Sequence, residues 1–230
     1  GPAAIAGMAI GDKLIKVGDS VVAGRNITSK RIIKMLKGKQ YSRVYITLLR
    51  AGDGSKKVVS VKRDIVPVYS VDAVVMLNET TGYIKINKFA STTHSEFTAG
   101  IQKLSAAGME ELIVDVRQNP GGYLGAAVNI ADELLDDNKL IVYTEGKSAA
   151  RVEYKTEKPG LFEQGKVIIL VDETSASASE ILAGAIQDWD RGLVIGRRTY
   201  GKGLVQEQYE MDDGAGLRLT VAKYYTPSGR

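Results

Sequence analysis

The 230-residue sequence contains no cysteine and a single histidine. Without cysteine there is no disulfide bond, no thiolate nucleophile and no cysteine-ligated metal. One histidine, His94, cannot build a histidine-rich metal site, and any Ser-His-Asp mechanism would depend on it alone. We therefore expect neither a metal nor another cofactor.

Long apolar runs are also missing. None approaches the roughly 18 residues that a membrane-spanning helix needs. The first residues lack the charged start and apolar stretch of a signal peptide, so an exported protein would carry its targeting segment outside this sequence. The net charge of +4 is small. The longest basic cluster, Lys30 to Lys39, falls on one expected helix, and we interpret it as a solvated helix face rather than a nucleic-acid surface.

The composition indicates two units. Residues 1–63 alternate short apolar runs with Gly-Asp turns, and they include an expected helix from Thr28 to Leu36. Two strand-like runs follow, Val44 to Leu49 and Val58 to Val61, joined by a glycine-rich turn. This pattern predicts a small module of mixed α+β class.

Residues 64–230 have a different organisation. A linker and a leading strand are expected around Pro67, and a capping box at Thr93–Glu96 is expected to open a helix. Beyond it, strands alternate with longer helices, which predicts an α/β core with helices covering a sheet. The expected strands are Tyr83–Phe89, Leu112–Val116, Val167–Val171, Leu193–Gly196, Gly203–Tyr209 and Leu217–Tyr224.

One segment of tiny residues, Ser175 to Ser179, lies between a buried strand and a helix. Small side chains leave room for a substrate backbone, and the free N–H groups of a helix start can stabilise an oxyanion. Ser177 is well placed there as a nucleophile. However, Ser177 and Glu180 also have the spacing of a capping box, and the segment alone favours that structural explanation.

A serine nucleophile needs a base, and there are few candidates. His94 is expected at the exposed start of a helix. Lys202 lies between two glycines at the start of an apolar strand. A lysine is almost entirely protonated at neutral pH, but burial favours the neutral amine, which can accept a proton. Gln206 is four residues further on, which is the same face of a regular strand. Taken alone, Lys202 is better explained as a surface charge at a glycine-bounded turn.

The loop Asn119–Gly122 is the third component. Its glycines let backbone N–H groups approach a ligand closely, so it could supply an oxyanion donor. A simple tight turn explains the same spacing.

Taken together, four motifs resemble the S41 family of tail-specific, or carboxyl-terminal processing, proteases. They are D.R.NPGG at Asp115–Gly122, SASASEI.AGA.QD at Ser175–Asp188, GKG.VQ at Gly201–Gln206 and YYTPSGR at Tyr224–Arg230. The resemblance covers nearly the whole chain. It implies a crotonase-like α/β protease core over residues 64–230.

The resemblance also implies roles for individual residues. Ser177 would be the nucleophile, Lys202 its general base and Gln206 the residue that supports the lysine. The oxyanion donors would be the backbone N–H groups of Ala178 and of the Gly121–Gly122 pair. Ser175 and Ser179 would act as spacing residues, and we expect a structural ion pair for Asp188.

The N-terminal unit resembles a PDZ domain. The motifs Gly1–Gly7, Gly11–Asp12 and Ile15–Gly18 are similar to the PDZ signature, and the helix Thr28–Leu36 would flank the peptide groove. In that case the carboxylate-binding loop and the strand that pairs with the peptide would precede Gly1. The far edge of the protease core would likewise follow Arg230.

The function implied is that of a serine endopeptidase that cleaves proteins near their C-termini, with the PDZ unit recruiting the substrate tail and gating the site. The family further implies a location outside the cytoplasm, in the periplasm or cell envelope of a bacterium. The alternatives are a PDZ adaptor with an inactive protease-like core and, more weakly, a serine esterase. No nucleic-acid partner is expected, and a homo-oligomer or a regulatory protein partner stays open.

Overall fold

The structure is a computed structural model that describes residues 1–66 and 68–230. It divides the chain into two compact units, Gly1–Val68 and Tyr69–Arg230. The division falls slightly beyond the boundary expected after residue 63. Pro67, at the centre of the expected linker, lies outside the described residues. Each unit has its own hydrophobic core.

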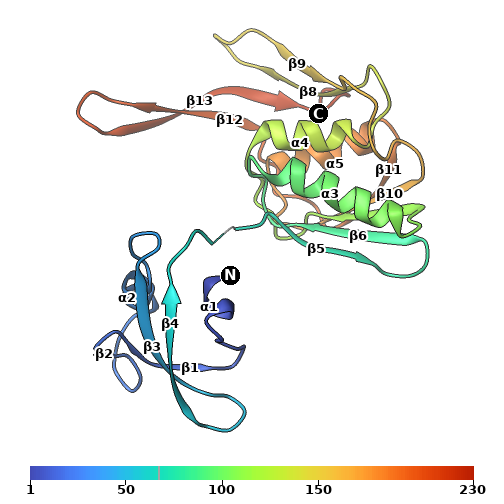
Figure 1. The fold of residues 1–230 in the computed structure, drawn as a ribbon. Helices are drawn as coiled ribbons and strands as arrows, with labels where there is room; N and C mark the ends of the chain where they lie inside the picture. Colours follow the sequence, from blue (N-terminus) through green and yellow to red (C-terminus); the bar gives the residue numbers. More distant parts are fainter. Residues whose placement is uncertain (67) are drawn as a thin grey trace. The chain divides into compact units, whose positions relative to one another are not determined.

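The first unit is a four-stranded antiparallel sheet with strand order β2-β1-β3-β4 and two short helices (Figure 1). The apolar residues that alternate along β3 and β4 are buried, as expected of strands with one face on a core. The elements are α1 (Pro2–Ile5), β1 (Lys13–Val17), β2 (Ser20–Val21), α2 (Ser29–Leu36), β3 (Arg43–Leu49) and β4 (Lys56–Lys62).

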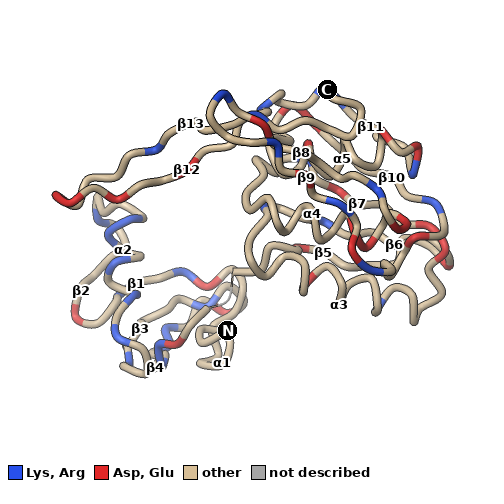
Figure 2. The backbone as a smooth tube through the Cα atoms, turned by 90° about the horizontal axis from the view of Figure 1, so that it is seen from above, with Lys and Arg blue, Asp and Glu red and all other residues tan. Residues whose placement is uncertain are grey.

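Helix α2 is amphipathic. Thr28 caps it by accepting a hydrogen bond from the Arg31 N–H at 3.4 Å. Ile32 and Leu36 pack on the core of the first unit, whereas Lys30 and its basic neighbours are exposed. Figure 2 shows this basic stretch along the helix. The exposed basic side chains are those expected of a solvated helix face, and the absence of a nucleic-acid partner stays a prediction.

The second unit is built on a five-stranded sheet of order β11-β10-β7-β6-β5. Its strands are parallel except for the antiparallel edge strand β5. Runs of Val, Ile and Leu form the inner strands β7 and β10, as is typical of parallel strands covered by helices, whereas the inner strand β6 is less apolar. The strands are β5 (Val71–Met76), β6 (Thr81–Ile86), β7 (Glu111–Asp115), β10 (Lys166–Val171) and β11 (Gly192–Gly196).

A layer of helices and a second sheet complete this unit. The helices are α3 (Thr93–Ala106), α4 (Leu124–Asp132) and α5 (Ala178–Asp188). They lie between the five-stranded sheet and an antiparallel sheet of order β12-β13-β8-β9 (Figure 1). The second sheet consists of β8 (Leu140–Glu145), β9 (Val152–Lys155), β12 (Leu204–Glu210) and β13 (Gly216–Tyr225). The α/β class expected from the sequence is confirmed, while β8 and β9 were not predicted.

The parallel pairing of β7 with β10 brings two loops together. Leu170 is opposite Asp115 in the register, so both strands end at the same edge of the sheet. The loop that leads to Gly122 follows β7, and the loop that leads to Ser177 follows β10. Loops at the carboxyl ends of parallel strands form the usual ligand-binding edge of an α/β sheet.

The capping box expected at Thr93–Glu96 is wrong. The N-cap of α3 is Thr92, and it makes no side-chain capping bond. The Glu96 carboxylate instead accepts the N–H groups of Ser70 and Val71 at 2.8 and 2.9 Å, together with the Ser70 hydroxyl at 2.9 Å. Glu96 therefore fixes the start of β5 rather than the start of its own helix.

Across residues 1–66 and 68–230, no helix combines the length and the apolar character that crossing a membrane would require.

Candidate active site

Ser177 lies at a sharp turn between β10 and α5. Its backbone has φ +55° and ψ −114°, a region that residues other than glycine seldom occupy. The neighbouring Ala176 and Ala178 are buried, and larger side chains would not fit there. A serine on a strained strand-to-helix turn is the arrangement that presents the nucleophile in many hydrolases. The sequence indicated the small neighbours but not the strained backbone.

The two flanking serines join this turn to the neighbouring loop. The Ser175 hydroxyl donates to the carbonyl of Val116 at 2.8 Å, and the Ser179 hydroxyl donates to the carbonyl of Asn119 at 3.0 Å. The Ala176 N–H donates to the same Asn119 carbonyl at 3.1 Å. Both serines are fully buried. They therefore lock the nucleophile turn against the loop that follows β7.

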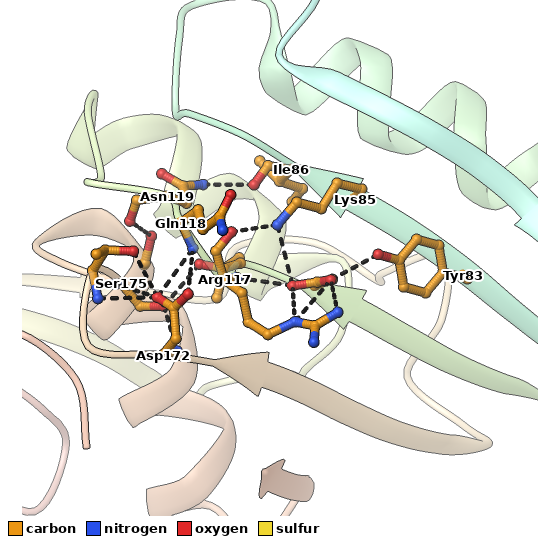
Figure 3. Close-up of polar contacts among 12 residues, drawn as sticks. Tyr83, Lys85, Ile86, Arg117, Gln118, Asn119, Asp172 and Ser175 are labelled. Atoms are coloured by element: carbon orange, nitrogen blue, oxygen red, sulfur yellow. Dashed lines mark hydrogen bonds and ion pairs between the residues drawn. The ribbon is translucent and has the colours of Figure 1, made fainter. Parts of the chain in front are cut away.

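That loop is organised by Asn119, which is fully buried. Its side-chain amide donates to the Ile86 carbonyl at 2.9 Å and accepts the Gly121 N–H at 2.9 Å. Asp172 accepts the Gln118 N–H at 3.0 Å, which adds a second link between the two loops (Figure 3). Burial acts to raise the pKa of Asp172, but hydrogen bonds from Gln118 and Thr174 outweigh it and lower the pKa to about 2.

Gly121 contacts the backbone of the nucleophile turn. A Cβ at this position would lie 2.5 Å from the Ala176 carbonyl oxygen and 2.8 Å from the Ser177 Cβ. The residue also has φ +95°, which side-chain-bearing residues rarely adopt. This contact is the physical reason for glycine at this point of the NPGG segment.

The start of the loop is held by a buried carboxylate. Asp115 accepts hydrogen bonds from the Tyr83 hydroxyl at 2.7 Å and from the Arg117 guanidinium at 2.7 Å, and it pairs with Lys85 at 3.2 Å (Figure 3). Burial acts to raise the pKa of Asp115, but Arg117 and Tyr83 outweigh it and hold the pKa far below its usual range. Asp115 therefore stays charged and orders the loop that leads to Gly122.

Glu180 connects the nucleophile to the lysine segment. The expected capping box with Ser177 is present, with Glu180 accepting the Ser177 N–H at 2.8 Å. The same oxygen accepts the Lys202 N–H at 2.9 Å, and the other oxygen accepts the Gly201 N–H at 2.5 Å. The sequence suggested Glu180 as a local helix cap, but it also fixes a segment more than twenty positions away.

The three residues expected to carry the chemistry line one cavity of about 410 Å³, namely Ser177, Lys202 and Gln206. Lys202 is half-buried, while Gln206 is exposed. Strand β12 begins at Leu204 and has an irregular register between Val205 and Gln206, so regular strand alternation is not what places the two side chains. They reach the same cavity through the irregular backbone.

Two backbone N–H groups, one next to Ser177 in the chain and one at the cavity, could hold an oxyanion. Ala178 is the first residue of α5, where an N–H has no partner within the helix. Gly122 lines the cavity, and its N–H makes no hydrogen bond within the part of the chain that the structure describes. The Gly121 N–H, in contrast, is occupied by Asn119. Of the two glycines, only Gly122 therefore has an N–H group without a hydrogen-bond partner among the described residues.

His94 is separate from this cavity. Its Nε2 lies 2.7 Å from Oε1 of the buried Glu133, which also pairs with Lys158 at 3.0 Å. The ion pair expected of Asp188 is present, with Arg230 as its partner. Neither group reaches Ser177, so among the described residues Lys202 is the base candidate that shares a cavity with the serine.

A serine on a strained strand-to-helix turn at the edge of a cavity is the arrangement of a serine hydrolase. The model of the peptidase family S41 matches residues 80–230 of this chain. The chain belongs to peptidase family S41.

Named relatives agree with this membership. The chain is 36% identical over 230 residues to a carboxyl-terminal-processing protease of Picosynechococcus, covering 98% of this chain and 54% of that protein. It is 36% identical over 228 residues to the carboxy-terminal processing protease CtpA of Bacillus subtilis, covering 99% of this chain and 48% of that protein. The chain thus spans about half the length of the curated relatives it matches.

The fold agrees as well. The solved structure of a photosystem II D1 C-terminal processing protease is similar, with a TM-score of 0.63 and 30% sequence identity. The similarity covers 100% of this chain and 62% of that one. The S41 core expected from the sequence motifs is confirmed.

Proposed function

We propose that the protein is a serine endopeptidase with a Ser–Lys dyad that cleaves protein substrates near their C-termini. The observation that carries the proposal is the shared cavity of Ser177, Lys202 and Gln206. Gly122 lines the same cavity, and Ala178 follows Ser177 as the first residue of α5. The names of the relatives, which are C-terminal processing proteases, support this substrate class.

In the proposed mechanism Ser177 Oγ attacks the carbonyl carbon of a peptide bond while Lys202 Nζ takes the Oγ proton. The N–H groups of Ala178 and Gly122 donate to the oxyanion that forms. Collapse of this intermediate breaks the C–N bond, and the leaving amine takes the proton from Lys202. A water molecule then attacks the acyl-serine ester, again with Lys202 as base, and restores the free hydroxyl.

The proposed base must be uncharged to act. Lys202 is half-buried, and it lines the cavity together with the apolar residues Ile181 and Leu204. Gln206 lines the same cavity, and we propose that its amide orients the lysine.

We further propose that the first unit is a PDZ-like module that recruits the substrate tail and gates the site. A groove of about 650 Å³ runs along it, lined by apolar side chains of α2 and the sheet that include Ile33, Leu36 and Ile46. Such a groove suits an extended peptide with apolar side chains. The protein would meet its substrates outside the cytoplasm, in the cell envelope, as expected from the family.

Mass spectrometry of a C-terminally tagged protein substrate tests this function. Wild type is expected to release the tag at defined bonds, whereas Ser177→Ala and Lys202→Ala should release about 10³-fold less or none. The exposed Lys223→Ala, on β13, serves as a matched control for loss of a lysine. Equal cleavage by wild type and Ser177→Ala would refute the protease hypothesis and favour the alternative of a PDZ adaptor with an inactive protease-like core. Cleavage of small esters without cleavage of peptides would favour the esterase.

A further inference from the structure

Tyr224, on β13, has a hydroxyl that is buried without a hydrogen-bond partner. Its side chain packs into the core of the second unit, and the residue is 9% exposed. Across the described residues, its Oη is the one buried side-chain polar atom that lacks a partner. An unpaired buried hydroxyl costs free energy, and a phenylalanine would fill the same space without that cost. The hydroxyl therefore calls for a functional explanation.

The position of Tyr224 supplies one. The ring lines the cavity that contains Ser177 and Lys202. The Tyr224 N–H donates to the Gly203 carbonyl at 3.1 Å, which fixes β13 against the segment that carries the lysine. Glu180 fixes the same segment to the Ser177 turn. Hydrogen bonds to the backbone thus fix the segment of Tyr224 relative to the segments of Ser177 and Lys202.

The electrostatic environment keeps this hydroxyl a donor. Burial raises the pKa of Tyr224 well above its usual range, and the charge of Glu180 raises it further. The phenol is therefore neutral wherever the enzyme would work. A neutral phenol beside the serine can donate a hydrogen bond but cannot act as the base.

We propose that the Tyr224 hydroxyl orients the nucleophile by donating a hydrogen bond to Ser177 Oγ when the dyad is assembled. The serine proton is then left to point at Lys202, and the developing charge on Oγ meets a donor. This inference rests on the proposed function, because it assigns Tyr224 a role in the same reaction. The YYTPSGR motif contains both Tyr224 and Tyr225, and the sequence alone does not show which of them has this role.

The test is the rate at which a fluorophosphonate probe labels Ser177 in the full chain. The probe reports the reactivity of the serine itself. The rate constant is divided by the fraction of folded protein in each preparation, which is measured from its cooperative thermal unfolding. Tyr224→Phe is expected to lower the rate about 10- to 100-fold, the effect of losing a hydrogen bond to a charged group. Its Tm should be unchanged or higher by about 2–4 °C, because an unpaired buried hydroxyl is removed.

The adjacent tyrosine provides the control. Tyr225 stacks on Tyr143 with ring centroids 4.9 Å apart and does not line this cavity. Tyr225→Phe should label at the wild-type rate. Labelling of Tyr224→Phe within twofold of wild type would overturn the inference. With a peptide substrate, kcat is expected to fall and KM to stay close to wild type, whereas a structural defect would alter both.

Two further measurements separate the possible failures. If wild type and Ser177→Ala label alike, the proposed function itself fails, and this inference fails with it. If Ser177 is labelled and Tyr224→Phe matches wild type, this inference alone fails. A crystal structure of the wild-type phosphonyl adduct gives an answer independent of any variant. A distance from Tyr224 Oη to Ser177 Oγ of up to about 3.2 Å supports the hydrogen bond, and a longer one contradicts it.

Discussion

One oxygen of the Glu180 carboxylate accepts the backbone N–H of Lys202 at 2.9 Å while it also accepts the N–H of Ser177 at 2.8 Å. A single oxygen therefore sets the separation of the two backbone segments that carry the proposed nucleophile and base. Glu180 has no need to contact a substrate to affect catalysis, because it determines where both of these residues lie.

Glu180→Gln should consequently lower kcat about 100-fold, because a displacement of about 1 Å between reacting groups has that effect. A glutamine cannot present two acceptor oxygens to the N–H groups of Ser177, Gly201 and Lys202. Steady-state kinetics on a tailed peptide would measure the change. The control is Glu173→Gln, which removes an exposed carboxylate paired with Arg197 at 3.1 Å and should leave kcat unchanged. Equal kcat values for the two variants would contradict the assignment.

Gly121→Ala is expected to inactivate the enzyme and to destabilise it. Both it and Gly214→Ala place a side chain at positive φ, at a cost of about 1–2 kcal/mol. A Cβ at Gly214 has open space, whereas one at Gly121 collides with the nucleophile turn, which adds about 1–3 kcal/mol. Urea unfolding of the two variants measures the difference. Similar unfolding midpoints for the two variants would mean that the Ser177 turn moves to accommodate the added Cβ without a loss of stability.

Asp115→Asn should lower the free energy of unfolding by about 2–4 kcal/mol, because it leaves Arg117 and Lys85 without their anion. Glu111→Gln removes a carboxylate from the same strand, but that group pairs with the exposed Lys166 and should matter by less than about 1 kcal/mol. Denaturant titration at neutral pH compares them. Activity should also fall in Asp115→Asn, because the loop that leads to Gly122 loses its support.

The acid limit of stability should depend on Asp172. Its pKa in the folded protein is about 2, below the ordinary value of 3.8, so the unfolded chain binds the proton more tightly. The carboxylate therefore stabilises the fold above about pH 4, and this contribution is lost as the pH falls through about 2. The difference in urea midpoint between wild type and Asp172→Asn should shrink over that window. If the difference in urea midpoint between the two proteins stays constant down to pH 2, a group other than Asp172 causes the loss of stability in acid.

The elements that carry strong local patterns could be predicted from the sequence. The apolar runs Val167–Val171 and Val58–Val61 predicted strands, and the spacing of Ile32 and Leu36 predicted a helix. Strand β8 contains the apolar run Leu140–Tyr143 and β9 alternates apolar and polar residues, but both patterns are short, and neither strand was predicted. Their pairing with each other and with β13 is a tertiary effect.

The site shows a similar division. Linear motifs identified Ser177, Lys202 and Gln206, because each motif is continuous in the chain. They could not show that Asn119 occupies the Gly121 N–H, or that Glu180 reaches Lys202 as well as its own helix. The same limit explains the error at Glu96, where a local spacing fitted a cap but the partners came from Ser70 and Val71. Partners that fold in from distant segments leave no mark in a local pattern.

The left-handed backbone at Ser177 makes reactivity a property of the intact tertiary structure. Once the hydrogen bonds from Ser175 and Ser179 break, we expect the turn to relax to an ordinary backbone conformation. The Ser177 hydroxyl would then be no more reactive than that of any other serine. A nascent or partly melted chain would therefore be inert towards its neighbours, including other copies of itself. Loss of enzymatic competence should precede global melting when the protein is heated.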